Sequence, residues 1–194
     1  DALSEQQRLS YDIYRQHLLY EQQASEYIKY SYPATYGFFG WPASTELFFT
    51  DVFIVNNEKQ ARIYLALLNQ VERRFKQIET LLQTRRDDDI LEPKITFSYS
   101  HNLIANLAST QATSTSYYQV FEQHVNNLST LDSDTKQALL AEAQLIVEQR
   151  ILPAYQSLGD VMASQLPFAP NNIGIGQFDG GDEFYQAQLN YFTS

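Results

Sequence analysis

The stretch that decides the fold is residues 57–84, "NEKQARIYLALLNQVERRFKQIETLLQT". Its apolar residues recur at spacings of three and four, which places them on one face of a helix. Asn56 or Asn57 is suited to cap the start of that helix, with Glu58 near the positive end of its dipole. The pattern therefore predicts one long helix that packs against others through a single stripe: Ala61, Tyr64, Leu65, Leu68, Val71, Phe75, Ile78 and Leu82.

Helical patterns also lie on both sides of this stretch. A first helix, capped by Ser4, carries Leu9, Ile13, Tyr20, Ala24 and Tyr27 on one side and should end before Pro33. The segments "HNLIANLAST" and "TSTSYYQVFEQHVNNLST" predict two shorter helices. Another long helix should run from the cap signal "LDSDT" to about Ser164, with a kink where Pro153 removes a backbone hydrogen bond.

Alternation with period two, the mark of a strand, is almost missing from the sequence. Only "TELFFTDVFIV", residues 45–55, could be an extended piece, and it has no obvious partner strand. The sequence therefore predicts an all-α protein, an antiparallel bundle of long helices that forms one lobe of a larger helical protein. We expect residues 1–194 to be a single lobe in which the loop 166–181 leads to a last helix, "DEFYQAQLNYFT".

Charge and composition exclude several classes of function. The formal net charge is −10, so the chain lacks the cationic surplus that nucleic acid or an anionic membrane attracts. The pairs Arg73–Arg74 and Arg85–Arg86 offer the only local basic patches, and "RRDDD" (85–89) should be a solvated helix end. There is no cysteine and no apolar run long enough for a transmembrane segment. The start resembles no signal peptide and has no initiator Met, so we expect a piece of a longer chain.

The glycine-rich stretch "NNIGIGQFDGGDEFYQAQLNYF", residues 171–192, could be a phosphate cradle, a substrate loop or a turn. A phosphate loop needs a strand before it and a lysine after the glycines, whereas here acidic residues crowd the helix start. We therefore expect a turn with Asp182 as the N-cap, whose glycines allow positive φ and close backbone approach. His17, His101 and His124 show no metal-ligand spacing, and no catalytic set stands out.

Residues 11–53 hold nearly half of the tyrosines and phenylalanines and the single tryptophan, Trp41. Tyrosines that fill the seams between helices explain most of this enrichment. The alternative is a stacking platform for a ligand, and the loop 32–42 with Tyr36 and Trp41 would be its centre.

A family resemblance emerges from the order of several short motifs. "LSEQQRLSYDIYRQHL" (3–18), "ARIYLALLNQV" (61–71), "ILEPKI" (90–95), "LPAYQSL" (152–158) and the closing "IGIGQFDGGDEFYQAQLNYFTS" follow one another along the chain. In this order they resemble the N-terminal half of the bacterial proteins grouped as domain of unknown function family 885. The closing motif departs from the family pattern: Phe178 replaces a proline and Phe184 a tyrosine, which weakens the match without breaking it.

The resemblance implies a helical protein similar to zinc peptidases, often an exported lipoprotein of the periplasm or cell envelope. The family's His-Glu motif, which would hold zinc and activate water, does not occur in this sequence. The resemblance thus implies no cofactor and no catalytic or metal residue in this chain, with zinc held by the missing C-terminal half of the parent. Asp179, Gly181 and Tyr185 become candidates for the border of a peptide substrate cleft, beside Tyr36 and Trp41.

Two functions remain open at this point. The chain is either a non-catalytic N-terminal helical lobe that forms part of a substrate cleft wall in a zinc-peptidase-like protein, or an autonomous helical binding module that uses the aromatic-rich segment 11–53. In the first case an apolar face should be exposed where the missing half packs, so dimers of the fragment could also form.

Overall fold

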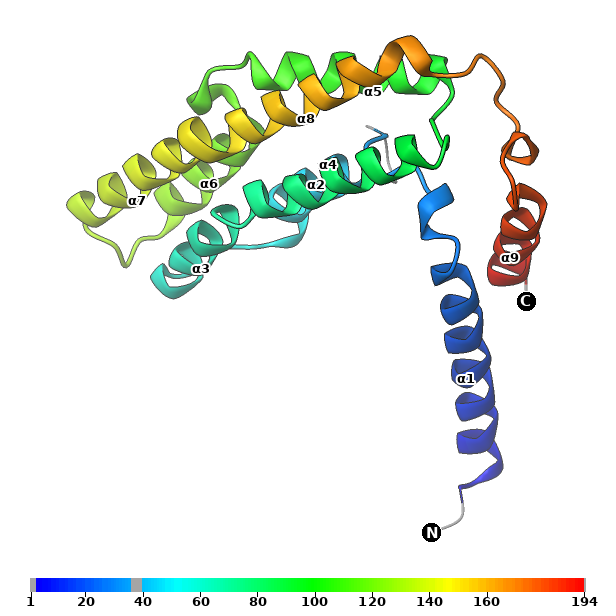
Figure 1. Ribbon diagram of the computed structural model, residues 1–194. Coiled ribbons are helices and arrows are strands. Elements are labelled where there is room, and N and C mark those ends of the chain that lie inside the picture. Colours follow the sequence, from blue (N-terminus) through cyan, green and yellow to red (C-terminus); the bar gives the residue numbers. More distant parts are fainter. Residues whose placement is uncertain (1–2, 36–39, 194) are drawn as a thin grey trace. The chain divides into compact units, whose positions relative to one another are not determined.

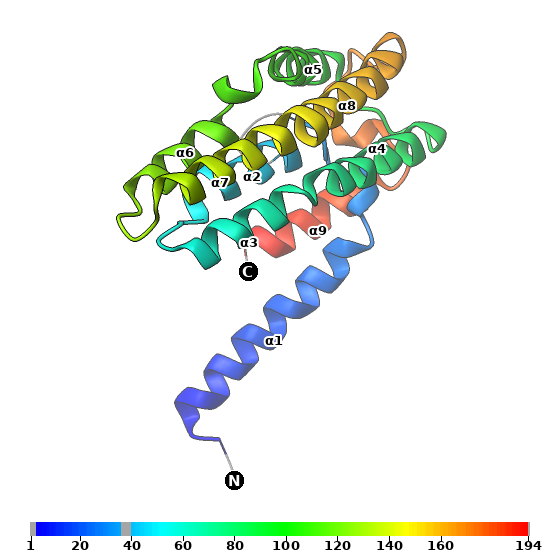
Figure 2. The same ribbon diagram turned by 90° about the vertical axis from the view of Figure 1, so that its left-hand side faces the viewer.

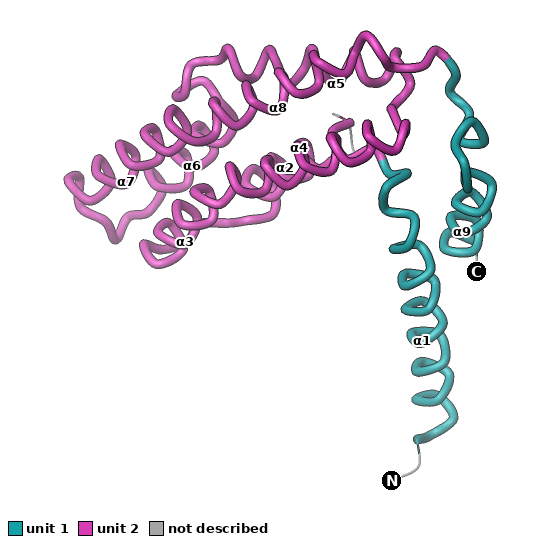
Figure 3. The backbone as a smooth tube through the Cα atoms, viewed as in Figure 1, with its two compact units in different colours: residues 1–31, 172–194 teal, residues 32–171 magenta. Residues whose placement is uncertain are grey.

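The computed structural model describes residues 3–35 and 40–193, and this part of the chain is all-α, as predicted (Figure 1). Its contacts group into two compact units, residues 1–31 with 172–194 and residues 32–171 (Figure 3). The helices of the larger unit are α2 (Trp41–Leu47), α3 (Glu58–Leu68), α4 (Val71–Asp87), α5 (Lys94–Ala108), α6 (Ser116–Asn127), α7 (Ser133–Ile146) and α8 (Leu152–Gln165). The helices of the smaller unit are α1 (Glu5–Ser25) and α9 (Gly181–Thr193), and short 3₁₀ turns at 28–30, 112–114, 166–168 and 175–177 complete the chain.

In the larger unit, α3 and α4 follow one another in one direction, and α7 and α8 return in the opposite direction (Figures 1 and 2). Helix α8 packs against both α4 and α5, and α7 packs against α3 and α6. This arrangement confirms an antiparallel bundle. All eight residues of the predicted stripe in 57–84 are buried, so the three- and four-residue spacing located the core face correctly.

The core of the larger unit is rich in aromatic rings, and the tyrosine hydroxyls among them form hydrogen bonds. The Tyr64 ring stacks on Phe121 with centroids 4.6 Å apart, and its hydroxyl donates to the Tyr117 carbonyl at 2.8 Å. The hydroxyls of Tyr117 and Tyr155 lie 2.9 Å apart, and Tyr155 meets Phe75 edge-on. Because each hydroxyl has a partner, tyrosine can fill the core without leaving a buried polar group unpaired.

The predicted single helix 57–84 is wrong in one respect, because it breaks at Asn69–Gln70 into α3 and α4. The backbone N–H and the side chain of Asn69 both donate to the Leu65 carbonyl, at 3.0 and 3.3 Å, and the next N–H, that of Gln70, donates to the Leu67 carbonyl three residues back. Asn57 is the N-cap of α3, and its side chain accepts from the Gln60 backbone at 3.0 Å, which confirms one of the two predicted caps.

Two other irregularities are π-helical turns. Residues 45–55 are not the extended piece that alternation suggested: α2 continues into a π turn at Phe48–Val52, and the chain leaves helix only at Phe53. A second π turn, Val147–Ile151, joins α7 to α8 directly before Pro153. The regular helical hydrogen bonding is therefore interrupted next to Pro153, which has no N–H for the helical bond and where the sequence predicts a kink.

The smaller unit consists of α1 paired with α9 and of the loop between residues 172 and 180. Ser4 caps α1 in a capping box with Gln7, as predicted, but the α-helix ends at Ser25, earlier than Pro33 required. The rings of Tyr27 and Tyr30 lie near Phe184, and His17 lies near Tyr191 with centroids 5.6 Å apart.

Candidate functional site

The glycine loop of the smaller unit has the turn geometry that the sequence predicts. Gly180 has a φ of 75°, and a Cβ on Gly181 would lie 2.1 Å from the Ile175 carbonyl oxygen. The Tyr30 hydroxyl donates to the Asp179 carbonyl across this loop. Helix α9 begins at Gly181, so Asp182 lies in its first turn and is not the predicted N-cap. The glycines therefore serve to bring the backbone close to itself before α9.

The predicted cleft residues fall into three groups. Asp179, Gly181 and Tyr185 come together at the start of α9: Gly181 is buried, whereas Asp179 and Tyr185 are exposed. Trp41 belongs to the larger unit, where it is half-buried at the first position of α2. Tyr36 lies outside the described residues.

The histidines offer no zinc site in the part of the chain that the structure describes. His17 on α1 lies 3.5 Å from the Glu21 carboxylate, both side chains being about half exposed, while His101 lies on α5 and His124 on α6. No group of three His, Cys, Asp or Glu residues suited to a metal occurs within residues 3–35 and 40–193. These side chains do not fit the zinc that the family resemblance implies, and we derive no step through a metal.

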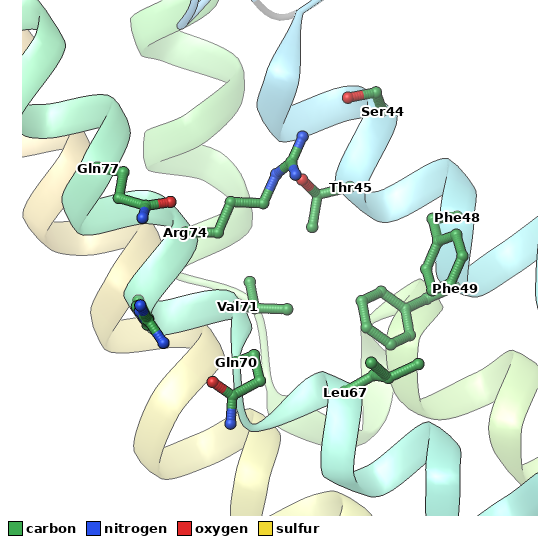
Figure 4. A pocket seen from close by; sticks show the side chains of 10 residues that line it. Ser44, Thr45, Phe48, Phe49, Leu67, Gln70, Val71, Arg74 and Gln77 are labelled. Atoms are coloured by element: carbon green, nitrogen blue, oxygen red, sulfur yellow. The ribbon is translucent and has the colours of Figure 1, made fainter.

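A groove of about 510 Å³ lies in the larger unit, between α2 with its π turn and the junction of α3 and α4 (Figure 4). We call it the α2–α4 groove. Four side chains are apolar, Phe48, Phe49, Leu67 and Val71, and of these Phe49 and Val71 are buried. The polar lining is Ser44, Thr45, Gln70, Arg73, Arg74 and Gln77.

The arginine side chains give the groove its charge. In Figure 4 the Arg74 side chain reaches across the groove towards Thr45 on α2. Neither Arg73 nor Arg74 forms an ion pair with any described carboxylate. The reason lies in the sequence: no acidic residue stands three or four positions from either arginine, whereas Arg62 has Glu58 at that spacing.

The carboxylates near this groove are already engaged elsewhere. Glu72 on α4 contacts Lys76 at 2.6 Å and Arg150 at 2.9 Å. Hydrogen bonds from Lys76 and then from Arg150 hold the pKa of the Glu72 carboxyl below its usual value. Glu46 on α2 accepts a hydrogen bond from the Ser116 hydroxyl. The groove thus presents positive charge over an apolar floor in a chain whose net charge is −10.

A second polar cluster lies at the last turn of α4, and its charged pair is fully buried. Arg85 and Glu92 are each 1% exposed, with Nη1 and Oε1 3.8 Å apart. The Thr35 hydroxyl donates to Glu92 at 2.7 Å, and the Arg85 guanidinium lies over the Tyr32 ring. Burial raises the pKa of the Glu92 carboxyl, against the opposing influence of Thr35 and Arg85. The prediction that residues 85–89 form a solvated helix end is therefore wrong at Arg85, which faces inward.

Sequence reasoning missed the α2–α4 groove because it considered Arg73–Arg74 only as a weak nucleic-acid patch. The signal was available: two adjacent arginines without acidic helical neighbours, in a strongly acidic chain. It could not be connected to Phe48 and Phe49, because alternation in residues 45–55 suggests extended chain and does not reveal the turn that brings α2 to α4.

The fold and this groove define an all-α protein with an open groove lined by arginines and apolar side chains. The chain belongs to the family described as bacterial protein of unknown function (DUF885), whose family model matches residues 1–194. A solved structure, "The crystal structure of the putative lipoprotein from Colwellia psychrerythraea", has a similar fold, with a TM-score of 0.74 over 77% of this chain at 22% identity. The match spans only 26% of that longer chain. Among curated proteins, none matches the sequence.

Proposed function

We propose that residues 1–194 act as a non-catalytic helical lobe of a larger DUF885 protein and form part of the wall of a substrate cleft. The observation that carries this proposal is the exposed apolar surface of α1. Support comes also from family membership over the whole sequence and from a solved neighbour of which most lies outside the match.

Helix α1 has apolar side chains on more than one side, yet none of its residues is buried. Leu9 and Ile13 of the predicted stripe are 54% and 62% exposed. Tyr11, Tyr14 and Leu18, at i, i+3 and i+7, form a second stripe that is also exposed and borders a shallow hollow of about 310 Å³. Exposed apolar surface of this kind marks a site of association.

The occupant that we assign to this surface is a further helical part of the same protein. A helix exposed on several sides buries its stripes only when further protein packs around it, and a solved neighbour that is much longer than the match supports such an arrangement. In this proposal Asp179, Gly181 and Tyr185, at the start of the neighbouring α9, border the substrate cleft. Zinc and peptide hydrolysis, which the resemblance implies, would belong to residues beyond this sequence.

Hydrogen exchange tests the lobe proposal directly. The α1 amides should exchange at least about ten-fold more slowly in the longer gene product than in the 194-residue chain, because packing would bury the helix. Helix α8, already buried, is the internal control. Equal exchange of α1 in both proteins would contradict the proposal, and protection that grows with the concentration of the short chain would assign the surface to a second copy instead.

A matched pair of variants sharpens this test. Leu18→Gln places a polar group in the second stripe and should reduce α1 protection in the longer protein. Asp12→Ala, at an exposed position of the same helix outside both stripes, should leave it unchanged. If both variants behave alike, the Leu18 stripe is not the packed surface.

The second candidate function is an autonomous binding module, favoured by the α2–α4 groove. This groove lies within the segment 11–53 only in part, since Arg73 and Arg74 come from α4. A binding role for the groove is compatible with either function.

We also propose the cell envelope as the site of action, as for an exported lipoprotein. The support is the similarity in fold to the Colwellia protein, which is described as a putative lipoprotein. In the described residues, no helix combines the length and apolarity that crossing a membrane requires. Fractionation of cells that express the native gene tests this assignment, and recovery in the cytoplasm would contradict it.

A further inference from the structure

We propose that the α2–α4 groove binds the C-terminal end of a peptide, with the terminal carboxylate on Arg74 and Arg73 and a large apolar side chain on the floor. This inference concerns ligand binding by residues 32–171 alone. It does not depend on a larger protein, so its failure would leave the lobe proposal untouched.

The arginines of the groove carry charge that is open to a ligand. Two guanidinium groups stand at one groove without a carboxylate partner among the residues described, although Asp and Glu outnumber Lys and Arg 23 to 13 in the chain. Arg62 and Arg150 pair with carboxylates elsewhere in the chain, whereas Arg73 and Arg74 remain open to a ligand at the groove. Guanidinium binds carboxylate through two parallel hydrogen bonds, so an unpaired arginine in a concave site suits an anionic ligand.

The floor of the groove is apolar and partly open to solvent. Phe48 and Leu67 are each 37% exposed, and they lie beside the buried Phe49 and Val71. An inorganic anion would leave this apolar surface in contact with water. A ligand that carries both a carboxylate and an apolar side chain would satisfy the arginines and cover the floor together.

The rim of the groove carries hydrogen-bonding side chains. Ser44, Gln70 and Gln77 line the same groove, and their side chains have both donors and acceptors. Within the described part of the chain, the Gln70 and Gln77 side chains form no hydrogen bond, while Ser44 donates to the Trp41 carbonyl at 3.1 Å. Amide side chains at a rim can pair with the alternating N–H and C=O groups of a peptide backbone, which a fatty acid or a phosphate lacks. The volume of about 510 Å³ is within the range of small-molecule sites, about 300–1,000 Å³.

Calorimetric titration of the 194-residue chain tests the proposal with acetyl-Ala-Ala-Phe as the free acid and as its C-terminal amide. The acid should bind saturably with one site, and the amide at least about ten-fold more weakly, because the amide has no charge for the guanidinium groups. Equal binding of both peptides, or no saturable binding of the acid, would overturn the proposal.

Variants assign the binding to the groove. Arg74→Gln should weaken binding of the acid by about ten-fold or more, and Arg74→Lys should weaken it less, because the point charge remains while the fork is lost. Arg62→Gln, an exposed arginine of α3 outside the groove, is the matched control and should bind as the unmodified chain does. Circular dichroism confirms that each variant remains helical. Loss of binding in Arg62→Gln, or full binding in Arg74→Gln, would contradict the assignment.

Inorganic phosphate distinguishes the peptide from a simple anion. Phosphate should displace the peptide only weakly, since it cannot cover the apolar floor. If phosphate binds as tightly as the peptide acid, the groove is an anion site and the peptide assignment is wrong.

Discussion

Single residues decide the glycine turn before α9. A Cβ on Gly181 would meet the Ile175 carbonyl at 2.1 Å, and Gly180 holds a positive φ that costs other residues roughly 1–2 kcal/mol. Gly181→Ala and Gly180→Ala should therefore make the α9 amides exchange about 5–30-fold faster, as measured by mass spectrometry. Gly174→Ala is the control, because its Cβ would have an ordinary contact of 3.6 Å with Asn172. Unchanged exchange in Gly181→Ala would show that the backbone approach is not tight.

The buried pair Arg85–Glu92 is a second feature of residue scale. Glu92→Leu removes the carboxylate that faces the buried Arg85 charge, which should lower the free energy of unfolding by about 3–5 kcal/mol. The double variant Arg85→Met/Glu92→Leu removes both charges and should recover most of that loss. Urea unfolding of the two single variants and the double variant measures the coupling. A double variant as unstable as the sum of the singles would mean that the two charges do not interact.

The Glu72 carboxylate makes the stability of the fold depend on pH. Its pKa is lowered by hydrogen bonds from Lys76 and Arg150, so its contribution to stability is present above the ordinary glutamate pKa of about 4.3 and is lost as the pH falls through the lower folded pKa. Glu72→Gln should therefore be less stable than the parent at neutral pH and should match it near pH 3. Denaturant unfolding across this range measures the difference, with Glu142→Gln, at an exposed position on α7, as the control. A difference that persists at low pH would contradict this account.

Helices differ in how well their sequence predicts them. The stripe from Ala61 to Leu82 was predictable, because the three- and four-residue spacing of its apolar residues is visible within the segment itself. The break at Asn69–Gln70 was not, since no glycine or proline marks it within residues 57–84. The π turn at Phe48–Val52 was also hidden, because its apolar residues resemble the alternation of a strand. For the same reason the groove was missed, although Arg74 and its lack of acidic neighbours were visible.

The contrast between α1 and α8 leads to a prediction for whole helices. Helix α8 buries Ala154, Tyr155, Leu158 and Met162 among its residues, whereas α1 buries none. Local opening should therefore cost far less in α1, and its amides should exchange at least about a hundred-fold faster than those of α8 in the 194-residue chain. Amide exchange followed by mass spectrometry measures both helices in one sample. Similar rates would show that α1 is protected by contacts that its exposure does not reveal.

At the scale of the whole molecule, the hydrophobic core belongs to one unit. Every residue of the main buried cluster lies between Ala34 and Ala169, within the unit 32–171. The sequence predicted a single lobe because its helical stripes look alike along the chain. Which stripes become buried together depends on contacts between distant segments, such as α4 with α8, and periodicity carries no information about those.

This distribution of the core predicts that residues 32–171 fold without the rest of the chain. The shortened chain should remain helical by far-ultraviolet circular dichroism and should unfold cooperatively within a few degrees of the 194-residue chain, because α1 contributes no buried residue to lose. A chain of residues 32–151 is the control. It lacks α8, which packs against both α4 and α5, and should show no cooperative transition. If residues 32–171 also unfold without cooperativity, stability must come from residues 1–31 and 172–194, and the core of the larger unit is not sufficient by itself.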